Sequence, residues 1–301
     1  MENILIGGSG FIGSHIIEYL ERKKKQFRIL DIRTPFDAAR KYEFCDIRKP
    51  IKVRPEEIDT IFHLAALRNP KQAQNELEQT FKTNVIGTFN VCEWARKNDA
   101  KRLVFFSSYA VYGNNAKICS ESTPPKPCNN YGFSKFEGEQ VITNYCLNYG
   151  IQCVILRPAP VYGLNLFEGL GATLVINAYK QGVIRFTGNG KPTRQYLHVS
   201  DLISAIDLIF NASLSKIEIF NVAGEDSVSA KKIVEMVSTK LNNIPFSFSN
   251  GDGAFPGDII NSYVDTSKLK SLGWKPMHAF NDNYPAYIDY VIKEVATWKK
   301  I

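Results

Sequence analysis

Residues 4–13, with the sequence ILIGGSGFIG, decide the fold of this chain. A short apolar strand runs into a glycine-rich turn and then into a helical pattern, and this context disfavours a glycine turn with only a structural role. Gly7 permits the sharp turn, Gly10 lets a dinucleotide pyrophosphate approach the backbone, and Gly13 lets the helix pack closely on the strand. The phosphates then meet free N–H groups at the helix N-terminus. The turn residues that we assign to a dinucleotide cofactor are Gly7, Gly10, Phe11, Ile12 and Gly13.

Asp31 stands at the end of the next predicted strand, residues 27–30. A carboxylate at this position can accept hydrogen bonds from the adenosine ribose hydroxyls and repels a 2′-phosphate, so NAD is predicted in preference to NADP. Arg33 and Arg40 lie close by and could serve a 2′-phosphate if Asp31 turned away. A capped turn or a surface salt bridge is the structural alternative for Asp31.

Short β-rich runs alternate with amphipathic helical patterns along the chain. We predict strands at residues 4–6, 27–30, 60–63, 103–106, 152–156 and 218–221. This alternation predicts an α/β fold, a doubly wound parallel sheet with helices on both faces. Loop-like sequence rich in Pro and Gly is concentrated in two later segments. We therefore predict a dinucleotide-binding domain of residues 1–163 and 194–223 and a smaller α/β substrate-binding domain of residues 164–193 and 224–301.

Composition sets the broad class of the protein. The chain has 301 residues, of which 44% are hydrophobic and 22% charged, and this balance excludes a disordered protein. The net charge of +7 is scattered, so no nucleic-acid partner is predicted. Six cysteines show neither a C-x-x-C pair nor zinc-type spacing, which predicts reduced thiols and no metal site. No leader or membrane-length apolar run is evident, so we expect a cytoplasmic protein without a membrane partner.

Ser108, Tyr131 and Lys135 form the predicted catalytic group. Residues 103–106 read as a buried strand that ends in Ser107 and Ser108, and a helix opens later with Tyr131 and Lys135 four residues apart on one face. The lysine would lower the phenol pKa and steady the nicotinamide ribose, so that Tyr131 exchanges a proton with a substrate hydroxyl. Ser108 would hydrogen-bond the same oxygen.

Tyr19 and Lys23 have the same spacing as Tyr131 and Lys135. Only Tyr131, however, comes after a complete cofactor half-site and a strand that ends in serine. The order of the motifs therefore favours Tyr131 as the catalytic tyrosine.

Ordered motifs over almost the full chain resemble those of the extended short-chain dehydrogenase/reductases, the NAD-dependent epimerase/dehydratase family of nucleotide-sugar enzymes. The family has a Rossmann-type doubly wound sheet with a smaller C-terminal part. The matching motifs are GGSGFIGS at 7–14, CDIR at 45–48, HLAA at 63–66, NVIGT at 84–88, SSYAVYG at 107–113, YGFSK at 131–135, RP at 157–158, VYG at 161–163, RQYLHVSD at 194–201 and LGWKP at 272–276.

The resemblance also implies roles for individual residues. Asp46 and Ile47 would flank the adenine; Leu64, Ala65 and Ala66 would line the cofactor groove. Ser108, Tyr131 and Lys135 would be the catalytic triad, Ser108 and Tyr109 would contact the substrate, and Arg194 would grip its diphosphate. Without the resemblance, Asp46 and Arg194 read as surface charges, and His63 and His198 as structural histidines.

Two departures from the family narrow the prediction. Tyr109 and Ala110 stand where the sugar 4,6-dehydratases carry Asp and Glu, which argues against dehydratase chemistry. Pro160 and Phe255 replace an asparagine and an arginine that usually contact the nucleotide diphosphate. Arg194 is then the main visible anion anchor. The residues that could compensate are Arg185, Lys191 and Arg157.

These features favour an NAD-dependent nucleotide-sugar epimerase, in the first place a 4-epimerase, that oxidises its substrate transiently to a 4-keto sugar. One alternative is a 4-ketoreductase that consumes NADH or NADPH in equal amount to product, because the catalytic residues would be the same. Another is a non-catalytic dinucleotide-sensing protein, which would predict a damaged triad. The resemblance also implies a homodimer, formed by the helices near residues 79–97 and 131–148 across a two-fold axis.

Overall fold

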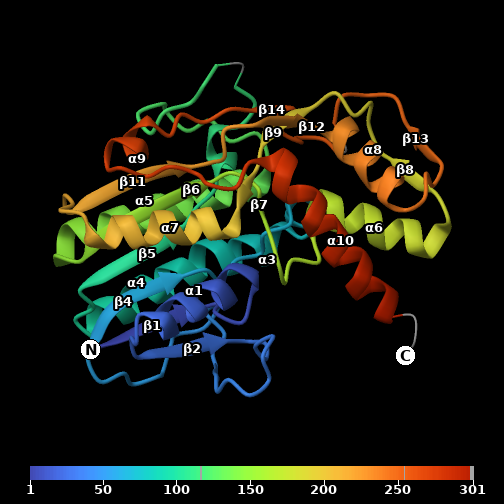
Figure 1. Cartoon of the computed structure of the whole chain (residues 1–301). Coiled ribbons are helices and arrows are strands. Elements are labelled where there is room, and N and C mark those ends of the chain that lie inside the picture. Colours follow the sequence, from blue (N-terminus) through green and yellow to red (C-terminus); the bar gives the residue numbers. More distant parts are fainter. Residues whose placement is uncertain (116, 254, 299–301) are drawn as a thin grey trace.

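Seven strands form the central sheet of the computed structural model, which describes residues 1–115, 117–253 and 255–298 (Figure 1). All neighbouring strands of this sheet pair in parallel. In sheet order they are β11 (Ile217–Val222), β6 (Gln152–Pro158), β5 (Arg102–Phe106), β4 (Ile58–His63), β1 (Glu2–Ile6), β2 (Phe27–Asp31) and β3 (Glu43–Phe44). The six predicted strands are confirmed. The two-residue edge strand β3 was not predicted, since so short a run carries no period.

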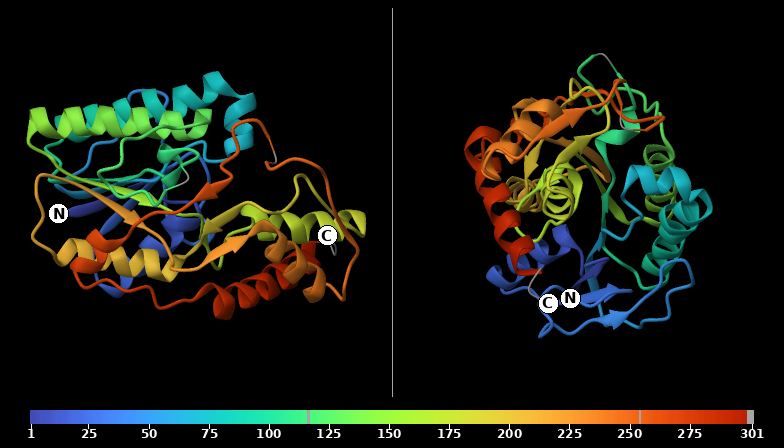
Figure 2. Two further views of the ribbon diagram at one scale, coloured as in Figure 1. Left: turned by 90° about the horizontal axis from the view of Figure 1, so that it is seen from above. Right: turned by 90° about the vertical axis from the view of Figure 1, so that its right-hand side faces the viewer.

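Side chains alternate between the two faces of the sheet. Leu5, Phe62 and Val104 join one buried cluster, while their neighbours join another, so that both faces are covered. This explains why the strands are continuous apolar runs. Figure 2 shows the two helical layers on opposite sides of the sheet. The helices of the first layer are α1 (Phe11–Arg22) and α7 (Val199–Asn211); those of the second are α4 (Gly87–Lys97) and α5 (Asn130–Tyr149).

A second group of elements lies beyond the carboxyl ends of the sheet strands, on the right in Figure 1. Its core is aromatic: Tyr162, Tyr196 and Phe280 pack with Tyr284 in one buried cluster. Its helices are α6 (Gly169–Gln181), α8 (Ala230–Lys240) and α10 (Phe280–Trp298). Its strands are β8 (Ile184–Phe186), which pairs with β13 (Phe246–Phe248), and β9 (Thr193–Gln195), which pairs with β12 (Ser227–Ser229) and β14 (Asn261–Ser262). The predicted boundary between residues 193 and 194 falls inside β9, and the division into two domains stays a prediction.

Short helices, turns and strands lie in the segments that connect these layers. They are α2 (Pro70–Asn75), α3 (Leu77–Phe81), the π-helical turn η1 (Lys82–Ile86), the 3₁₀ turn η2 (Tyr109–Tyr112), β7 (Val161–Tyr162), β10 (Leu197–His198) and α9 (Ser267–Ser271). Across the described ranges, no helix combines the length and the apolar character needed to cross a membrane.

The strand order reverses beside β1. The chain leaves β1 toward β2 and β3 on one side and returns to β4 on the other. Ligands of open parallel sheets bind in the crevice at such a reversal, beyond the carboxyl ends of the strands. Gly7 follows β1 and Leu64 follows β4, so the glycine-rich turn and the loop after His63 meet at this point.

Candidate active site

The glycine-rich turn is packed so tightly that two of its glycines cannot carry a side chain. Gly7 has a φ of 84°, and a Cβ there would lie 2.4 Å from the backbone nitrogen of Ala65. A Cβ on Gly13 would lie 2.3 Å from the carbonyl oxygen of Gly8. A Cβ on Gly10 would meet only the Gly7 oxygen, at 3.5 Å. Gly7 and Gly13 therefore serve packing, and the face of Gly10 is open to an approaching group.

The N-terminus of α1 offers donors to an anion. Gly10 is the N-cap and has no side chain to satisfy the first N–H groups of the helix. The hydroxyl oxygen of Ser9, within the turn, is buried and has no hydrogen-bond partner among the described residues. A buried hydroxyl without a partner is rare and points to a missing acceptor or donor. These residues fit the pyrophosphate of a dinucleotide.

Asp31 is buried and holds the turn in place. Its carboxylate accepts a hydrogen bond from the backbone nitrogen of Ser9 at 2.9 Å and one from that of Arg33 at 3.0 Å. The two bonds go to different oxygens, so each oxygen keeps a lone pair for a ribose hydroxyl. Arg40, the nearby cation considered for a 2′-phosphate, pairs with Glu21 at 3.0 Å. The turn-capping role of Asp31 is thus real and is compatible with the ribose role.

Asp46 is already paired with Arg48. The guanidinium donates two bonds of 2.8 Å to the Asp46 carboxylate, and this contact lowers the pKa of Asp46. Ile47 is buried against the start of α4, where a Cβ on Gly87 would lie 2.6 Å from it. The structure places both residues at the rim of the sheet, and their adenine role stays a prediction.

Leu64, Ala65 and Ala66 line the loop that follows β4. The backbone nitrogens of Leu64 and Ala65 both donate to the Ile6 carbonyl, at 2.8 and 2.9 Å. The loop is therefore bonded to the strand that leads into the glycine-rich turn. All three residues are partly exposed at this edge.

Tyr131 lies in the first turn of α5, and the structure brings it to Ser108. Asn129 caps the helix by accepting a bond from the Gly132 nitrogen at 2.8 Å. Gly132 permits close contact with η2, since a Cβ there would lie 2.5 Å from the Ala110 oxygen. Ser108 begins η2, and its hydroxyl hydrogen-bonds the Tyr131 side chain.

Burial, rather than Lys135, dominates the titration of Tyr131. Burial raises the pKa of Tyr131 to about 12, while the Ser108 hydrogen bond and the charge of Arg68 lower it. We expected Lys135 to bring the phenol pKa down from its ordinary value, and the structure does not show this depression. The reason is that the phenol is shielded from water, which disfavours the phenolate.

Lys135 is buried one turn further along α5. Its ammonium lies 4.1 Å from the centre of the Phe105 ring. Burial lowers the pKa of Lys135 to about 7, and the Glu139 carboxylate acts in the opposite direction. Lys135 is therefore close to losing its proton at neutral pH.

His63, at the end of β4, is buried near Lys135 and is neutral. Thr88 donates its hydroxyl hydrogen to the Asn84 carbonyl at 2.6 Å, so it accepts a bond from Nε2 of His63 at 2.9 Å. Burial and the charge of Lys135 lower the pKa of His63 to about 3. His198 stacks on His278 with ring centres 4.2 Å apart, and burial lowers its pKa to about 4. Neither histidine is a proton donor at neutral pH.

The alternative Tyr–Lys pair on α1 is a structural cluster. The hydroxyl of Tyr19 and the ammonium of Lys23 both bind Asp207 of α7, at 2.9 and 3.0 Å. The pair joins two helices on one face of the sheet.

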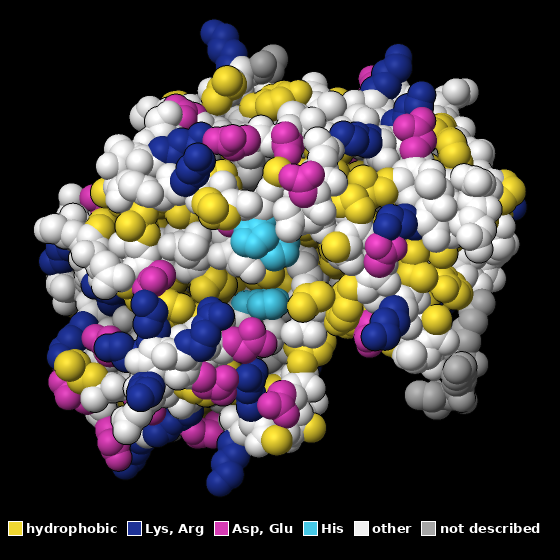
Figure 3. Space-filling model, viewed as in Figure 1, with side chains coloured by type: hydrophobic (Ala, Val, Ile, Leu, Met, Phe, Trp, Pro, Cys, Tyr) yellow, Lys and Arg dark blue, Asp and Glu magenta, His cyan; other side chains and the backbone are white. Residues whose placement is uncertain are grey.

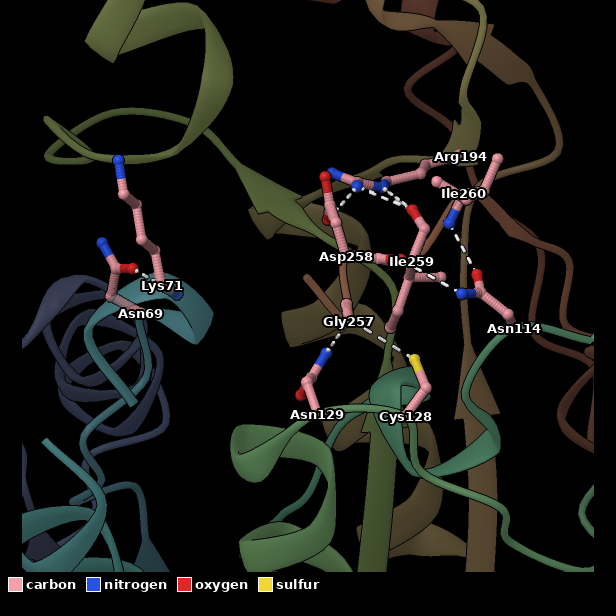
Figure 4. Close-up of polar contacts among 10 residues, drawn as sticks. All are labelled: Asn69, Lys71, Asn114, Cys128, Asn129, Arg194, Gly257, Asp258, Ile259 and Ile260. Carbon is pink, nitrogen blue, oxygen red and sulfur yellow. Dashed lines mark hydrogen bonds and ion pairs between the residues drawn. The ribbon is translucent and has the colours of Figure 1, made fainter. Parts of the chain in front are cut away.

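Arg194, the expected diphosphate anchor, is tied to the loop after Gly257 (Figure 4). Its Nη2 donates to Asp258 Oδ1 at 2.7 Å and to the Ile259 carbonyl at 2.7 Å. Figure 4 also shows Asn129 and Cys128 at the start of α5 bonded to Gly257. The Nη1 group of Arg194 makes no hydrogen bond to the described residues, and the side chain is 24% exposed.

Arg157, one of the residues considered as a substitute anchor, is buried within the protein. Its guanidinium donates to both carboxylate oxygens of Glu139, at 2.9 and 2.6 Å. It is therefore unable to compensate for Pro160 and Phe255. Arg185 and Lys191 are exposed. Lys71, drawn in Figure 4, extends from α2 on the other side of the view.

Tyr109 and Ala110 lie in η2, directly after Ser108. Burial raises the pKa of Tyr109, and Ala110 is buried without a titratable group. Neither residue can supply the acid and the base that water loss from a sugar requires.

Two polar residues near the site were missed in the sequence. Asn84, in the π-helical turn η1, bonds both backbone groups of Leu67 and the Ser134 hydroxyl, and so joins the cofactor loop to α5. Its signal in the sequence was its place at the start of the NVIGT motif, which carried no role for this residue. π-Helical turns are frequent at functional sites. Arg68, in the loop after β4, forms an ion pair of 2.9 Å with Glu168, the N-cap residue of α6. No pattern in the sequence singled out Arg68.

The surface around these elements carries both signs of charge. Figure 3 shows Lys and Arg side chains interspersed with Asp and Glu over the visible face. Many of them form exposed ion pairs, such as Lys240 with Asp289 at 2.5 Å. Such pairs contribute little to stability.

Comparisons with known proteins agree with this geometry over nearly the whole chain. A family model described as NAD dependent epimerase/dehydratase family matches residues 4–223. A putative UDP-glucose 4-epimerase of Methanocaldococcus jannaschii is 30% identical over 99% of this chain and 98% of its own length. A dTDP-glucose 4,6-dehydratase of Neisseria meningitidis serogroup B is 23% identical over 100% of this chain and 96% of its own length. The structure of a Thermus thermophilus UDP-glucose 4-epimerase in complex with NAD is similar with a TM-score of 0.84 and 25% identity, covering 97% of this chain and 99% of that one.

Proposed function

The chain belongs to the NAD-dependent epimerase/dehydratase family, and we propose from this premise that it is an NAD-dependent nucleotide-sugar epimerase that acts at C4. The observation that carries the proposal is the convergence of Ser108 and Tyr131 at the edge of the sheet that also bears the glycine-rich turn, without a carboxylate at positions 109 and 110. An epimerase needs one group that takes a proton and returns it, and Tyr131 is such a group.

The residues that would hold NAD are those of the turn and of the two neighbouring strand ends. Gly10 and the Ser9 hydroxyl would meet the pyrophosphate, Asp31 would bind the adenosine ribose, and Lys135 would bind the nicotinamide ribose. The adenine would lie against Asp46 and Ile47, with Leu64, Ala65 and Ala66 along the groove. The chemistry that NAD supplies when bound is reversible hydride uptake by the oxidised nicotinamide ring, whose positive charge also favours the phenolate.

Tyr131 accepts the proton of the sugar 4-hydroxyl and returns it to the same oxygen. Loss of this proton together with the hydride from C4 makes the sugar transiently a 4-keto sugar, which must present its other face before the hydride and the proton return. Ser108 donates a hydrogen bond to that oxygen and keeps it next to the phenol. Burial raises the pKa of Tyr131 to about 12 even though the charge of Arg68 acts in the opposite direction, so proton uptake by Tyr131 needs a further positive charge nearby.

The substrate side is built around Arg194. Its free Nη1 group supports an anion contact, which suits the diphosphate of a nucleotide sugar. Tyr109 lies close enough to Arg194 for the charge of the guanidinium to act on its phenol. The names of the relatives favour a UDP-hexose. We assign residues 164–193 and 224–301 to the substrate-binding domain; Ser108, Tyr109 and Arg194 would reach the substrate from the dinucleotide-binding domain.

A 4-ketoreductase is the competing function, and cofactor balance separates the two. An epimerase converts many equivalents of sugar per NAD without net change in absorbance at the nicotinamide band. A ketoreductase oxidises one NADH or NADPH for each product molecule. Loss of NADH absorbance in step with product would overturn the epimerase proposal. A non-catalytic sensor would leave every nucleotide sugar unchanged.

We further propose that the enzyme is a homodimer that pairs through α4 and α5. Large apolar side chains are exposed on these helices and on the segment that leads into α4: Leu77, Ile86, Phe89, Phe133, Leu147 and Tyr149. Exposed apolar side chains gathered on one pair of helices mark an interaction surface. Light scattering should give twice the chain mass for the native protein and one chain mass for Phe89→Glu. The matched control is Ile118→Glu, an exposed apolar residue of a distant loop.

The compartment that we propose is the cytoplasm. All six cysteines are free thiols, and five of them are buried. Reduced buried cysteines are typical of a reducing compartment. We also propose that nucleic acid is not a partner, because the positive charges are dispersed among acidic side chains.

A further inference from the structure

Glu139 lies at the centre of a buried polar network behind the catalytic residues. Its Oε1 accepts a bond from the Ser107 hydroxyl at 2.5 Å and one from Arg157 Nε at 2.9 Å. Its Oε2 accepts a bond from Arg157 Nη2 at 2.6 Å. The side chains of Glu139 and Arg157 are only 2% and 3% exposed. A buried ion pair of this kind is a weak source of stability, so its position calls for another explanation.

This network touches both elements that deliver the catalytic groups. Glu139 is on α5 one turn after Lys135, and residues four apart lie on the same helix face. Ser107 follows the end of β5 and immediately precedes Ser108. The Glu139 carboxylate therefore fastens the end of β5 to the helix that carries Tyr131 and Lys135.

The charged and titratable groups around Lys135 come from several elements. Glu139 and Tyr131 share its helix, His63 approaches from β4, and Arg157 reaches the Glu139 carboxylate from β6. The hydroxyl of Tyr112, in η2, accepts a hydrogen bond from Arg157 Nη1 at 2.8 Å. His63, Tyr131 and Tyr112 are neutral near pH 7, since burial disfavours their charged forms. What remains is the Glu139 carboxylate, which is bonded to the Arg157 guanidinium and lies one helical turn from Lys135.

We propose that Glu139 and Arg157 are positioning residues of opposite effect, which together set whether Lys135 holds its proton in the active site. The inference rests on the proposed function, because Lys135 is given its role there. Arginine cannot release its proton in a protein, whereas a buried lysine can. Of the two buried cations, only Lys135 can therefore respond to a change in the charge of the network by releasing its proton.

The sign of the effect differs for the two residues. Without the Glu139 charge, the two buried cations have no counter-charge in the network, and Lys135 releases its proton at lower pH. Without the Arg157 charge, Glu139 serves Lys135 alone, and Lys135 keeps its proton to higher pH. A network with only a structural role would weaken folding in both variants and would not move the titration in opposite directions.

The test is a direct titration of Lys135 by NMR in the full-length protein labelled with ¹³C at lysine Cε. Lys135→Met identifies the resonance. We expect the midpoint to fall by about one pH unit or more in Glu139→Gln and to rise by a similar amount in Arg157→Gln. Tyr112→Phe, which removes a hydroxyl from the network and no charge, should leave the midpoint unchanged.

Midpoints that stay fixed, or that move in the same direction in the two charge variants, would overturn the proposal. If Glu139→Gln does not fold, Glu139→Asp withdraws the charge by one methylene and should lower the midpoint by a smaller amount. The high-pH limb of kcat should follow the midpoints. Shifted midpoints without turnover of any nucleotide sugar would refute the proposed function and leave this inference standing; turnover with fixed midpoints would do the reverse.

Discussion

The backbone nitrogen of Ser9 donates a hydrogen bond of 2.9 Å to the carboxylate of Asp31, so one side chain fixes the glycine-rich turn to the end of β2. The same side chain is the proposed partner of the adenosine ribose. Asp31 would therefore influence both the choice between NAD and NADP and the shape of the glycine-rich turn. Changes at Asp31 should affect both.

Asp31→Asn keeps the size of the side chain and removes its charge. We expect NAD to bind about 10- to 100-fold more weakly, because hydrogen bonds to a charged acceptor are lost, while the discrimination against NADP decreases. Fluorescence titration with NADH and NADPH measures both affinities. Asp37→Asn, an exposed carboxylate of the same loop, is the control. An unchanged ratio of the two affinities in Asp31→Asn would contradict the assignment.

Gly10→Ala and Gly13→Ala should separate binding from folding. A methyl group on Gly10 meets only one atom within 4 Å, so we expect a stability loss of about 0.5–1 kcal/mol and a loss of NAD affinity of more than an order of magnitude. A methyl group on Gly13 overlaps the Gly8 backbone and should destabilise the fold by about 1–3 kcal/mol or more. Thermal unfolding and NADH titration of the two variants give the comparison. Equal NAD affinity in Gly10→Ala and the native protein would refute the role of the open face.

The sheet and the phosphate turn could be predicted from sequence because their signals are local. Each of the six predicted strands is a mainly apolar run of five to seven residues in the structure. Gly7 and Gly13 are required by contacts with neighbouring backbone, which few other residues allow. The Ser108, Tyr131 and Lys135 group was found from the order of motifs, and the structure brings Ser108 and Tyr131 into contact.

Charge pairing could not be predicted, because its partners are distant in sequence and their burial depends on the whole fold. The sequence suggested that Arg157 could bind the substrate, yet its guanidinium is buried and paired with Glu139, 18 residues earlier. The sequence suggested that the whole Arg194 guanidinium could bind an anion, yet its Nη2 group donates to Asp258, 64 residues later. The high pKa of Tyr131 has the same origin, since only packing reveals how far water is excluded.

Arg194→Gln should weaken substrate binding more than turnover. Loss of a charge-assisted contact to the diphosphate raises KM about 10- to 100-fold, while kcat changes little because the contact is made equally in the ground state and in the transition state. Steady-state kinetics with the nucleotide sugar measure the two constants. Asp258→Asn serves as the matched variant, since it leaves the guanidinium in place. A fall in kcat with unchanged KM in Arg194→Gln would rule out the anchor role.

Lys135 should make stability depend on pH in the absence of ligand. Its pKa is about 7 in the folded protein and returns to the ordinary lysine value of 10.5 when burial is lost, so the unfolded chain binds more protons between these limits. The free energy of unfolding therefore gains a contribution that rises with pH above about 7, by at most about 1.4 kcal/mol per pH unit. Denaturant unfolding of the native protein and Lys135→Met between pH 7 and 9 reveals it as a difference in slope. Parallel pH dependences would contradict the buried, weakly basic lysine.

Tyr131→Phe should remove turnover and spare binding. The phenol is the proposed proton carrier, and loss of a general acid–base group costs about 10²–10⁴-fold in kcat. NADH affinity should stay near the native value, because the ring remains in place. The rate of product formation is measured by ¹H NMR of the sugar anomeric signals. Normal turnover by the variant would exclude Tyr131 as the proton carrier.

The fate of hydrogen at C4 tests transient oxidation most directly. A panel of UDP-, dTDP-, GDP- and CDP-sugars first identifies the substrate, which is then supplied with deuterium at C4 and catalytic NAD. We predict that the C4 epimer forms with the deuterium still at C4 and without accumulation of NADH, because the same hydride returns to the sugar. Loss of the deuterium to water, or no inversion of any sugar in the panel by protein that binds NAD, would contradict the account.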